Sequence, residues 1–105
     1  MNPEDIYLKT VRAAEEWSVA DAEARRLKAL ERIILSEIIN RTEGNSFAEK
    51  KSKALGSPEY RLHIDRMISA RTEANLLKAK LEAVKDLSNN RRTQEVTKRT
   101  EMGIR

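Results

Sequence analysis

The chain has 105 residues, with 21 Lys and Arg against 17 Asp and Glu, a net charge of +4 and no Cys. This length allows one small domain, and the lack of Cys excludes disulfides, Cys nucleophiles and thiolate-bound metals. Three Gly and two Pro are too few for the frequent turns of an all-β chain, and no apolar run approaches the roughly 18 residues of a membrane-spanning helix, so we expect an all-α protein outside the membrane.

The first predicted helix covers residues 3–42. Asn2 precedes Pro3 and two acidic residues, an order typical of an N-cap and a first helical turn. Gly44 is placed like the residue that follows a helix C-terminus. Residues at alternating spacings of four and three form a heptad seam with two polar members. The seam consists of Ile6, Thr10, Ala13, Trp17, Ala20, Ala24, Leu27, Glu31, Ile34 and Ile38.

A short connector helix is predicted over residues 46–55, because Ser46 and Glu49 form a capping-box pattern. The chain then passes through Gly56, which reads as a helix stop.

A second long helix is predicted over residues 58–90, since Ser57 is a suitable N-cap and Pro58 suits the first helical position. We expect residues 91–105 to form a frayed, basic C-terminal segment, because Asn89 and Asn90 before it and the Thr residues within it have low helix propensity. The seam of this helix consists of Tyr60, His63, Met67, Ala70, Ala74, Leu77, Leu81, Val84 and Ser88.

The two long helices are predicted to pair as a coiled-coil-like antiparallel hairpin that forms one domain, residues 1–105. If the first helix ends near residue 43 and the second begins near residue 58, Ala24 faces Leu77 and Leu27 faces Ala74. Small residues then face large ones, as a well-packed helix pair requires.

A lone hairpin leaves apolar side chains beside both seams in water. A homodimer that forms a four-helix bundle would cover them, and coverage by a different protein is the main alternative. The interface candidates are Tyr7, Val11, Leu30, Ile33, Ile64, Ile68 and Leu76.

The sequence indicates no enzyme. His63 is the only histidine, and a di-iron Glu-x-x-His motif would need Glu where Tyr60 stands. We expect His63 to pack near Ile38, Tyr60 to keep a solvated hydroxyl, and Trp17 to fill space beside the seam alanines. The patterns therefore predict no catalytic residue, no cofactor and no metal site.

Two basic clusters are candidates for contact with nucleic acid or a partner. They lie at opposite ends of the predicted hairpin and contain no aromatic residue for base stacking, so we expect weak binding of nucleic acid. One cluster is Lys50, Lys51 and Lys53, with Arg41 near it, and the other is Arg91, Arg92, Lys98, Arg99 and Arg105.

The sequence Ser57-Pro58-Glu59-Tyr60, the helix that follows it and the ending from Arg91 to Arg105 resemble small, uncharacterised helical proteins of tailed phages, whose genes often lie near those of single-strand annealing recombinases. The resemblance implies a phage or prophage setting and an accessory, non-catalytic role. The N-terminus lacks the basic and apolar regions of a signal peptide, so we expect a location in the cytoplasm of a bacterial host.

The predicted function is protein–protein interaction through an oligomeric helical hairpin, with a dimer favoured. Two alternatives are a nucleic-acid-binding accessory of phage recombination and a phage-encoded inhibitor of a host factor.

Overall fold

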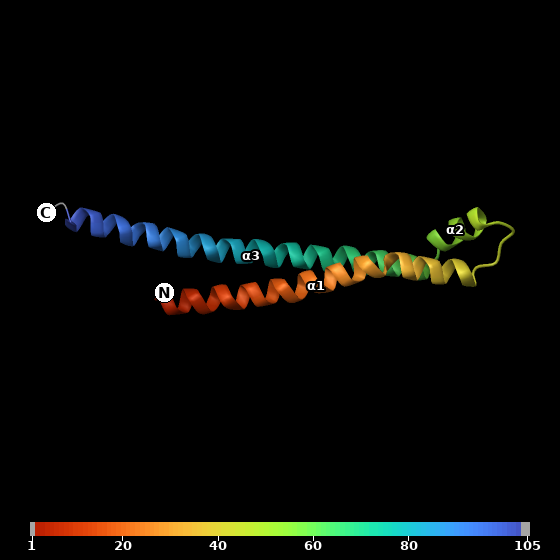
Figure 1. The fold of residues 1–105 in the computed structure, drawn as a ribbon, viewed down its shortest axis with the longest axis horizontal. Helices are drawn as coiled ribbons and strands as arrows, with labels where there is room; N and C mark the ends of the chain where they lie inside the picture. The colour runs from red at the N-terminus through yellow and green to blue at the C-terminus, as the bar shows by residue number, and fades with distance from the viewer. Residues whose placement is uncertain (1, 104–105) are drawn as a thin grey trace. The chain divides into compact units, whose positions relative to one another are not determined.

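The computed structural model describes the backbone of residues 2–103 and the side chains of residues 2–90. Its helices are α1 (Pro3–Arg41), α2 (Phe47–Leu55) and α3 (Pro58–Gly103), and no strand occurs among residues 2–103 (Figure 1). The all-α prediction is confirmed, and the first two helices agree with the predicted ranges to within one residue.

Helix α3 is longer than predicted, because it continues past residue 90 to Gly103. Asn and Thr cost only about 0.7 kcal/mol each in a helix relative to Ala. Residues 59–102 contain neither Pro nor Gly, so nothing in the sequence breaks the helix before Gly103. The predicted fraying concerns residues whose side chains lie outside the described part of the structure.

All three predicted N-caps are confirmed. Asn2 Oδ1 accepts a hydrogen bond from the backbone N–H of Asp5 at 2.9 Å. The hydroxyl oxygen of Ser46 accepts from the N–H of Glu49 at 3.1 Å, and that of Ser57 accepts from the N–H of Tyr60 at 3.2 Å. Each cap satisfies a backbone donor that the helix itself leaves without a partner.

Gly44 does not end α1, contrary to the prediction. The helix ends at Arg41, and the Thr42 hydroxyl donates to the carbonyl of Ile38 at 2.6 Å. Among the described residues no glycine has a positive φ. A Cβ at position 44 would lie 3.1 Å from Cγ of Lys50, so the absence of a side chain at Gly44 lets the loop after α1 pass close to α2.

The chain divides into two compact units, one formed by Met1–Ser18 with Asn75–Arg105 and the other by Val19–Ala74. The boundary crosses both α1 and α3. That the whole chain forms one domain stays a prediction.

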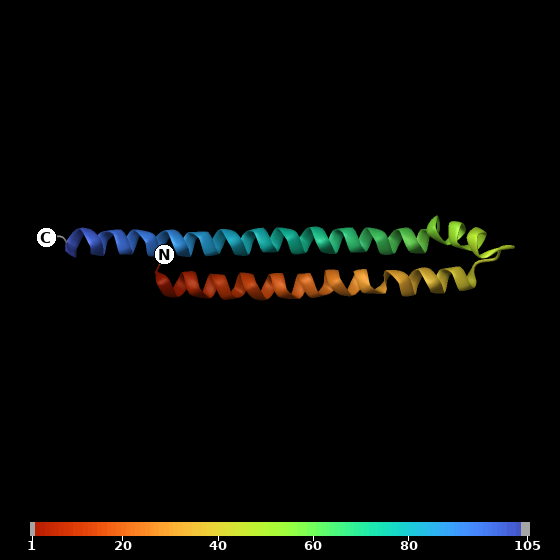
Figure 2. The ribbon, with the colours of Figure 1, turned by 45° about the horizontal axis from the view of Figure 1, so that its top comes forward.

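In the unit Val19–Ala74, α2 packs on the last two turns of α1. Ile38 and Ile39 of α1 and Ala54 of α2 are buried together, and Tyr60 packs against this cluster. Figure 2 shows that α1 extends beyond the first turn of α3, beside α2. The connector helix thus covers a surface that the prediction assigned to α3.

Three hydrogen bonds set the register of α1 and α3 in this unit and show that the two segments are antiparallel. They join Leu27 to His63 at 2.9 Å, Glu31 to Tyr60 at 3.2 Å and Asp21 to Arg71 at 2.9 Å.

The predicted register is therefore wrong. Leu27 is level with His63 and not with Ala74, a difference of about three turns of α3. The prediction assumed that α3 starts level with the end of α1. Because α2 occupies the end of α1, α3 begins farther along α1 toward its N-terminus.

In the unit formed by the two chain ends, Ile6, Ala13 and Leu81 are buried. Lys80 donates to Glu16 across the two helices at 3.4 Å. In both units every predicted seam residue is buried or half-buried, Trp17 included, so the heptad assignment is confirmed.

Candidate functional site

The predicted interface residues differ in their exposure. Tyr7, Ile33, Ile68 and Leu76 are exposed, whereas Val11, Leu30 and Ile64 are half-buried. Tyr7, Val11 and Leu76 belong to the unit of the chain ends, and the other four belong to Val19–Ala74. Ile68 is distinguished by its position at the edge of a groove.

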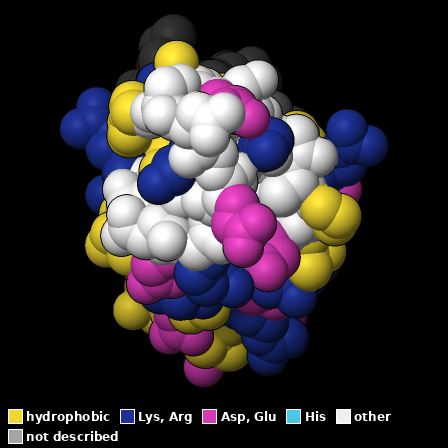
Figure 3. Space-filling view, turned by 90° about the vertical axis from the view of Figure 1, so that its right-hand side faces the viewer, with side chains coloured by type: hydrophobic (Ala, Val, Ile, Leu, Met, Phe, Trp, Pro, Cys, Tyr) yellow, Lys and Arg dark blue, Asp and Glu magenta, His cyan; other side chains and the backbone are white. Residues whose placement is uncertain are grey.

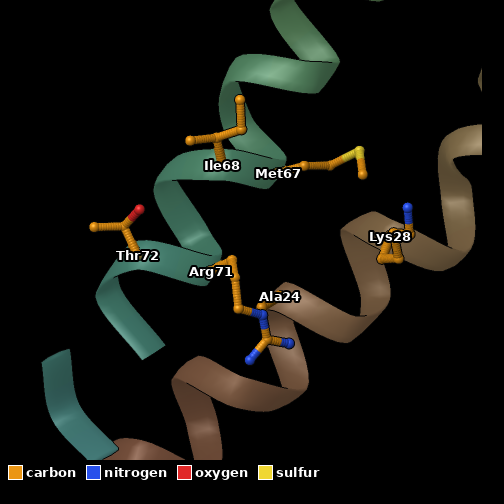
Figure 4. Close-up of a pocket in the computed structure, with 6 residues that line it drawn as sticks. All are labelled: Ala24, Lys28, Met67, Ile68, Arg71 and Thr72. Carbon is orange, nitrogen blue, oxygen red and sulfur yellow. The ribbon is translucent and has the colours of Figure 1, made fainter. Parts of the chain in front are cut away.

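This groove lies between α1 and α3 within the unit Val19–Ala74 and has a volume of about 460 Å³. Figure 4 shows its six lining side chains, with Arg71 reaching from α3 toward α1. Ala24 is only 3% exposed and lines the groove on the α1 side, while Ile68 is 60% exposed on the α3 side. The groove is lined by Ala24, Lys28, Met67, Ile68, Arg71 and Thr72.

The edges of the groove carry charged side chains that are mostly paired. Arg71 and Arg25 each contact the carboxylate of Asp21 at 2.9 Å, and Lys28 contacts Glu31 at 3.0 Å. Two guanidinium groups share one carboxylate, so this edge has a surplus of positive charge. The floor between the charges is apolar, a combination common at protein–protein interfaces.

Tyr60 and Glu31 form a polar contact across the seam. The Tyr60 hydroxyl donates to Glu31 Oε1 at 3.2 Å, so it is not simply solvated as predicted. Hydrogen bonds from Lys28, and secondarily from Tyr60, lower the pKa of Glu31 and outweigh the effect of burial. Burial, followed by the bond to Glu31, raises the pKa of Tyr60.

His63 is buried, and its Nε2 lies 2.9 Å from the carbonyl oxygen of Leu27. A carbonyl oxygen only accepts, so Nε2 is the donor in this contact. The prediction that His63 packs near Ile38 is wrong, because the register shift brings Tyr60 to that cluster instead. His63 serves as a hydrogen-bonded seam residue.

We expect Glu31→Gln to reduce the acid sensitivity of the fold. The pKa of Glu31 is lowered from 4.5 on folding, so its contribution to stability is present above that pH and is lost as the pH falls through the folded-state pKa. Urea unfolding at about pH 5 and about pH 3 measures this loss. Tyr60→Phe, which removes one of the two donors, should give an intermediate result. Identical pH dependence in the wild type and Glu31→Gln would contradict the assignment.

The predicted basic cluster of the connector is partly neutralised. Lys53 pairs with Glu49 at 3.2 Å, and nearby Arg41 pairs with Glu59 at 2.7 Å. Lys50 and Lys51 have no hydrogen bond or ion pair with any described side chain. In the view onto the α2 side, Lys and Arg alternate with Asp and Glu (Figure 3). The side chains of the second cluster, Arg91, Arg92, Lys98, Arg99 and Arg105, lie outside the described residues.

Within residues whose side chains are described, no three His, Asp or Glu groups gather closely enough to hold a metal ion. None of the described helices is long and apolar enough to cross a membrane. Comparison with models of known protein families, with curated proteins and with solved structures finds no match. The resemblance to phage proteins therefore stays a prediction.

The groove does not follow from the sequence patterns, because the predicted register places Ala24 opposite Leu77. A usable signal was present in the polar seam members. Buried polar groups need partners, and the predicted register paired Glu31 with the apolar Ala70. Matching Glu31 with Tyr60 would have selected the observed register.

Proposed function

We propose that the protein acts by binding protein chains through the groove of its helical hairpin, first of all copies of itself, and that it catalyses no reaction. The observation that supports this proposal is the groove of about 460 Å³ with the 60%-exposed side chain of Ile68 at its edge. Covering apolar surface stabilises an association by about 25 cal/mol per Å² removed from water. Ile68, which is exposed, and Met67, which is half-buried, provide such surface on α3.

The setting that we propose is that of an accessory protein of a phage or prophage, acting in the bacterial cytoplasm. This part of the proposal rests on the resemblance carried by Ser57-Pro58-Glu59-Tyr60 and by the C-terminal sequence. An inhibitor of a host factor would also act by protein binding, with the host protein as partner.

Nucleic-acid binding is the less favoured function. Phosphate binding needs cations that are free to replace counterions. In and near the basic cluster of the connector, Lys53 and Arg41 already pair with carboxylates. Of that cluster, Lys50 and Lys51 have no described partner.

Sedimentation equilibrium at micromolar concentration tests the proposal. We expect the wild type to have a mass above the 12.1 kDa of one chain and Ile68→Glu to shift the protein toward the monomer. Val19→Glu is the matched control, because Val19 is 73% exposed but does not line the groove. A wild type that stays monomeric would contradict self-association. Equal weakening by both substitutions would show that the groove has no special part in it.

A further inference from the structure

The groove belongs to a face of the hairpin that carries many cations. Lys28 and Arg71 line the groove itself. Residues seven apart lie on the same side of each helix in a hairpin of this kind, so Arg61 shares the side of α3 that presents Ile68. The cations of this face are all exposed, and they are Arg25, Lys28, Arg32, Arg61 and Arg71.

This face has a surplus of positive charge around exposed apolar surface. Arg32 and Arg61 have no hydrogen bond or ion pair with a described side chain. The other three cations pair with Asp21 and Glu31. Ile68 is 60% exposed among these charges. A protein segment that fits this face therefore carries carboxylates and apolar side chains on one side.

The first turns of α1 carry the complementary pattern. Tyr7 is 67% exposed, Glu4 is exposed and Val11 is half-buried. Their spacings of three and four residues place them on one side of the helix, and Glu15 follows on that side one turn later. Neither Glu4 nor Glu15 has a hydrogen bond or ion pair with a described side chain. Residues 3–15 thus offer carboxylates and exposed apolar surface together.

These residues can reach the groove only from a second copy of the chain. Because α1 is one unbroken helix from Pro3 to Arg41, residues 3–15 cannot fold back onto Lys28 and Arg32 of the same helix. The segment belongs to the unit of the chain ends, and the groove belongs to the unit Val19–Ala74. A contact between the two in different copies does not depend on how the units are arranged within one copy.

The segment matches α3 in spacing. On its groove side α3 presents a cation and then two isoleucines, at spacings of three and four residues, and residues 4–11 of α1 present a carboxylate and then two apolar side chains at the same spacings. The contact of Glu31 with Tyr60 also places Arg32 near the level of Arg61, so Glu4 would lie between two cations without described partners. The matched pairs are Glu4 with Arg61, Tyr7 with Ile64 and Val11 with Ile68.

Helix α2 fixes the direction of the docked segment. In the opposite direction the same spacings are met with Arg71 in place of Arg61, and the residues after Glu15 then run over Tyr60. That part of the face is occupied, because Tyr60 packs against the cluster that contains Ala54 of α2. A docked helix cannot fill the same space. Parallel to α3, the helix instead begins beside α2 and runs away from it.

We infer that the groove binds residues 3–15 of a second copy of this chain, in the same direction as α3. Val11 of one copy packs on Ile68 of the other, and Glu4 pairs with Arg61. This inference rests on the proposed function, because it names the segment that occupies the same groove.

Disulfide trapping tests the arrangement, since the chain contains no Cys of its own. Purified Glu4→Cys protein is mixed with tagged Arg61→Cys protein and oxidised, and the products are separated by size without reductant. Tagged Arg66→Cys is the matched control, because Arg66 is an exposed arginine of α3 that does not line the groove. We expect the mixed disulfide to form at least about tenfold faster with Arg61→Cys than with Arg66→Cys, because only the former brings the two sulfurs within bonding distance.

Each other outcome overturns the inference in a different way. Fastest trapping of Glu4→Cys with tagged Thr72→Cys, at the other end of the groove, would indicate the opposite direction. Equal trapping with Arg66→Cys would place the contact elsewhere. A wild type that sediments as a dimer but gives no trapping at Arg61→Cys would contradict the inference and leave self-association standing, whereas a monomeric wild type would remove both.

A charge exchange gives a second test that needs no cysteine. Glu4→Arg and Arg61→Glu should each raise the dimer dissociation constant about tenfold, because each brings like charges together in the contact. Asp5→Arg and Arg66→Glu make the same changes of charge on neighbouring sides of the two helices and should have little effect. The double substitution Glu4→Arg with Arg61→Glu should restore most of the affinity. Failure to recover any affinity would contradict the proposed pairing.

Discussion

Replacement of Ala74 by Asp is expected to lower the free energy of unfolding by at least about 3 kcal/mol, which is a large part of the roughly 5–15 kcal/mol that stabilises an ordinary fold. Ala74 has no exposed surface. A carboxylate at this position would be removed from water. The Ala74 methyl group is enclosed by neighbouring atoms, so the larger Asp side chain has no room beside them. Both the loss of hydration and the added volume oppose folding.

Ala79→Asp is the matched control for this substitution, because Ala79 lies on the same helix and is exposed. Both changes carry the same cost in helix propensity, about 0.7 kcal/mol, so the difference between them reports burial. Thermal unfolding followed by circular dichroism measures both variants. Similar melting temperatures for the two would show that α3 does not bury Ala74 in solution.

Replacement of Ile38 by Ala is expected to lower the free energy of unfolding by about 2–4 kcal/mol. Ile38 is buried with Ile39 and Ala54, where α2 packs on α1. Truncation leaves a cavity between the two helices and removes the apolar surface that holds α2 in place. The size of the effect depends on how far α2 moves to close the cavity.

Ile33→Ala makes the same chemical change on the same helix at a position that is 55% exposed, and we expect a loss below about 1 kcal/mol. Urea denaturation at one protein concentration compares the two variants and keeps any contribution from self-association constant. An equal loss for both substitutions would contradict the packing of α2 on the last turns of α1.

The candidate site was only partly predictable. Ile64 and Ile68 were recognised as side chains that widen the seam, because their positions follow from helical periodicity alone. The groove beside them depends on which α1 residue lies opposite. The prediction placed Leu77 opposite Ala24, whereas Met67 and Ile68 line the groove with Ala24 in the structure. The ion pair of Asp21 with Arg71 was missed for the same reason.

The amino-acid sequence by itself determined where the helices begin and which faces they bury. The caps at Asn2, Ser46 and Ser57 bind backbone groups three residues away, and the heptad pattern repeats within two helical turns. Both can therefore be predicted from one short stretch of sequence. Only the tertiary structure decided the register of α1 against α3. That register depends on where α2 docks, and the docking of Ala54 against Ile38 and Ile39 joins residues that are distant in the chain. Several registers pair apolar seams equally well, so the packing of the short helix was needed to select one and, with it, the groove.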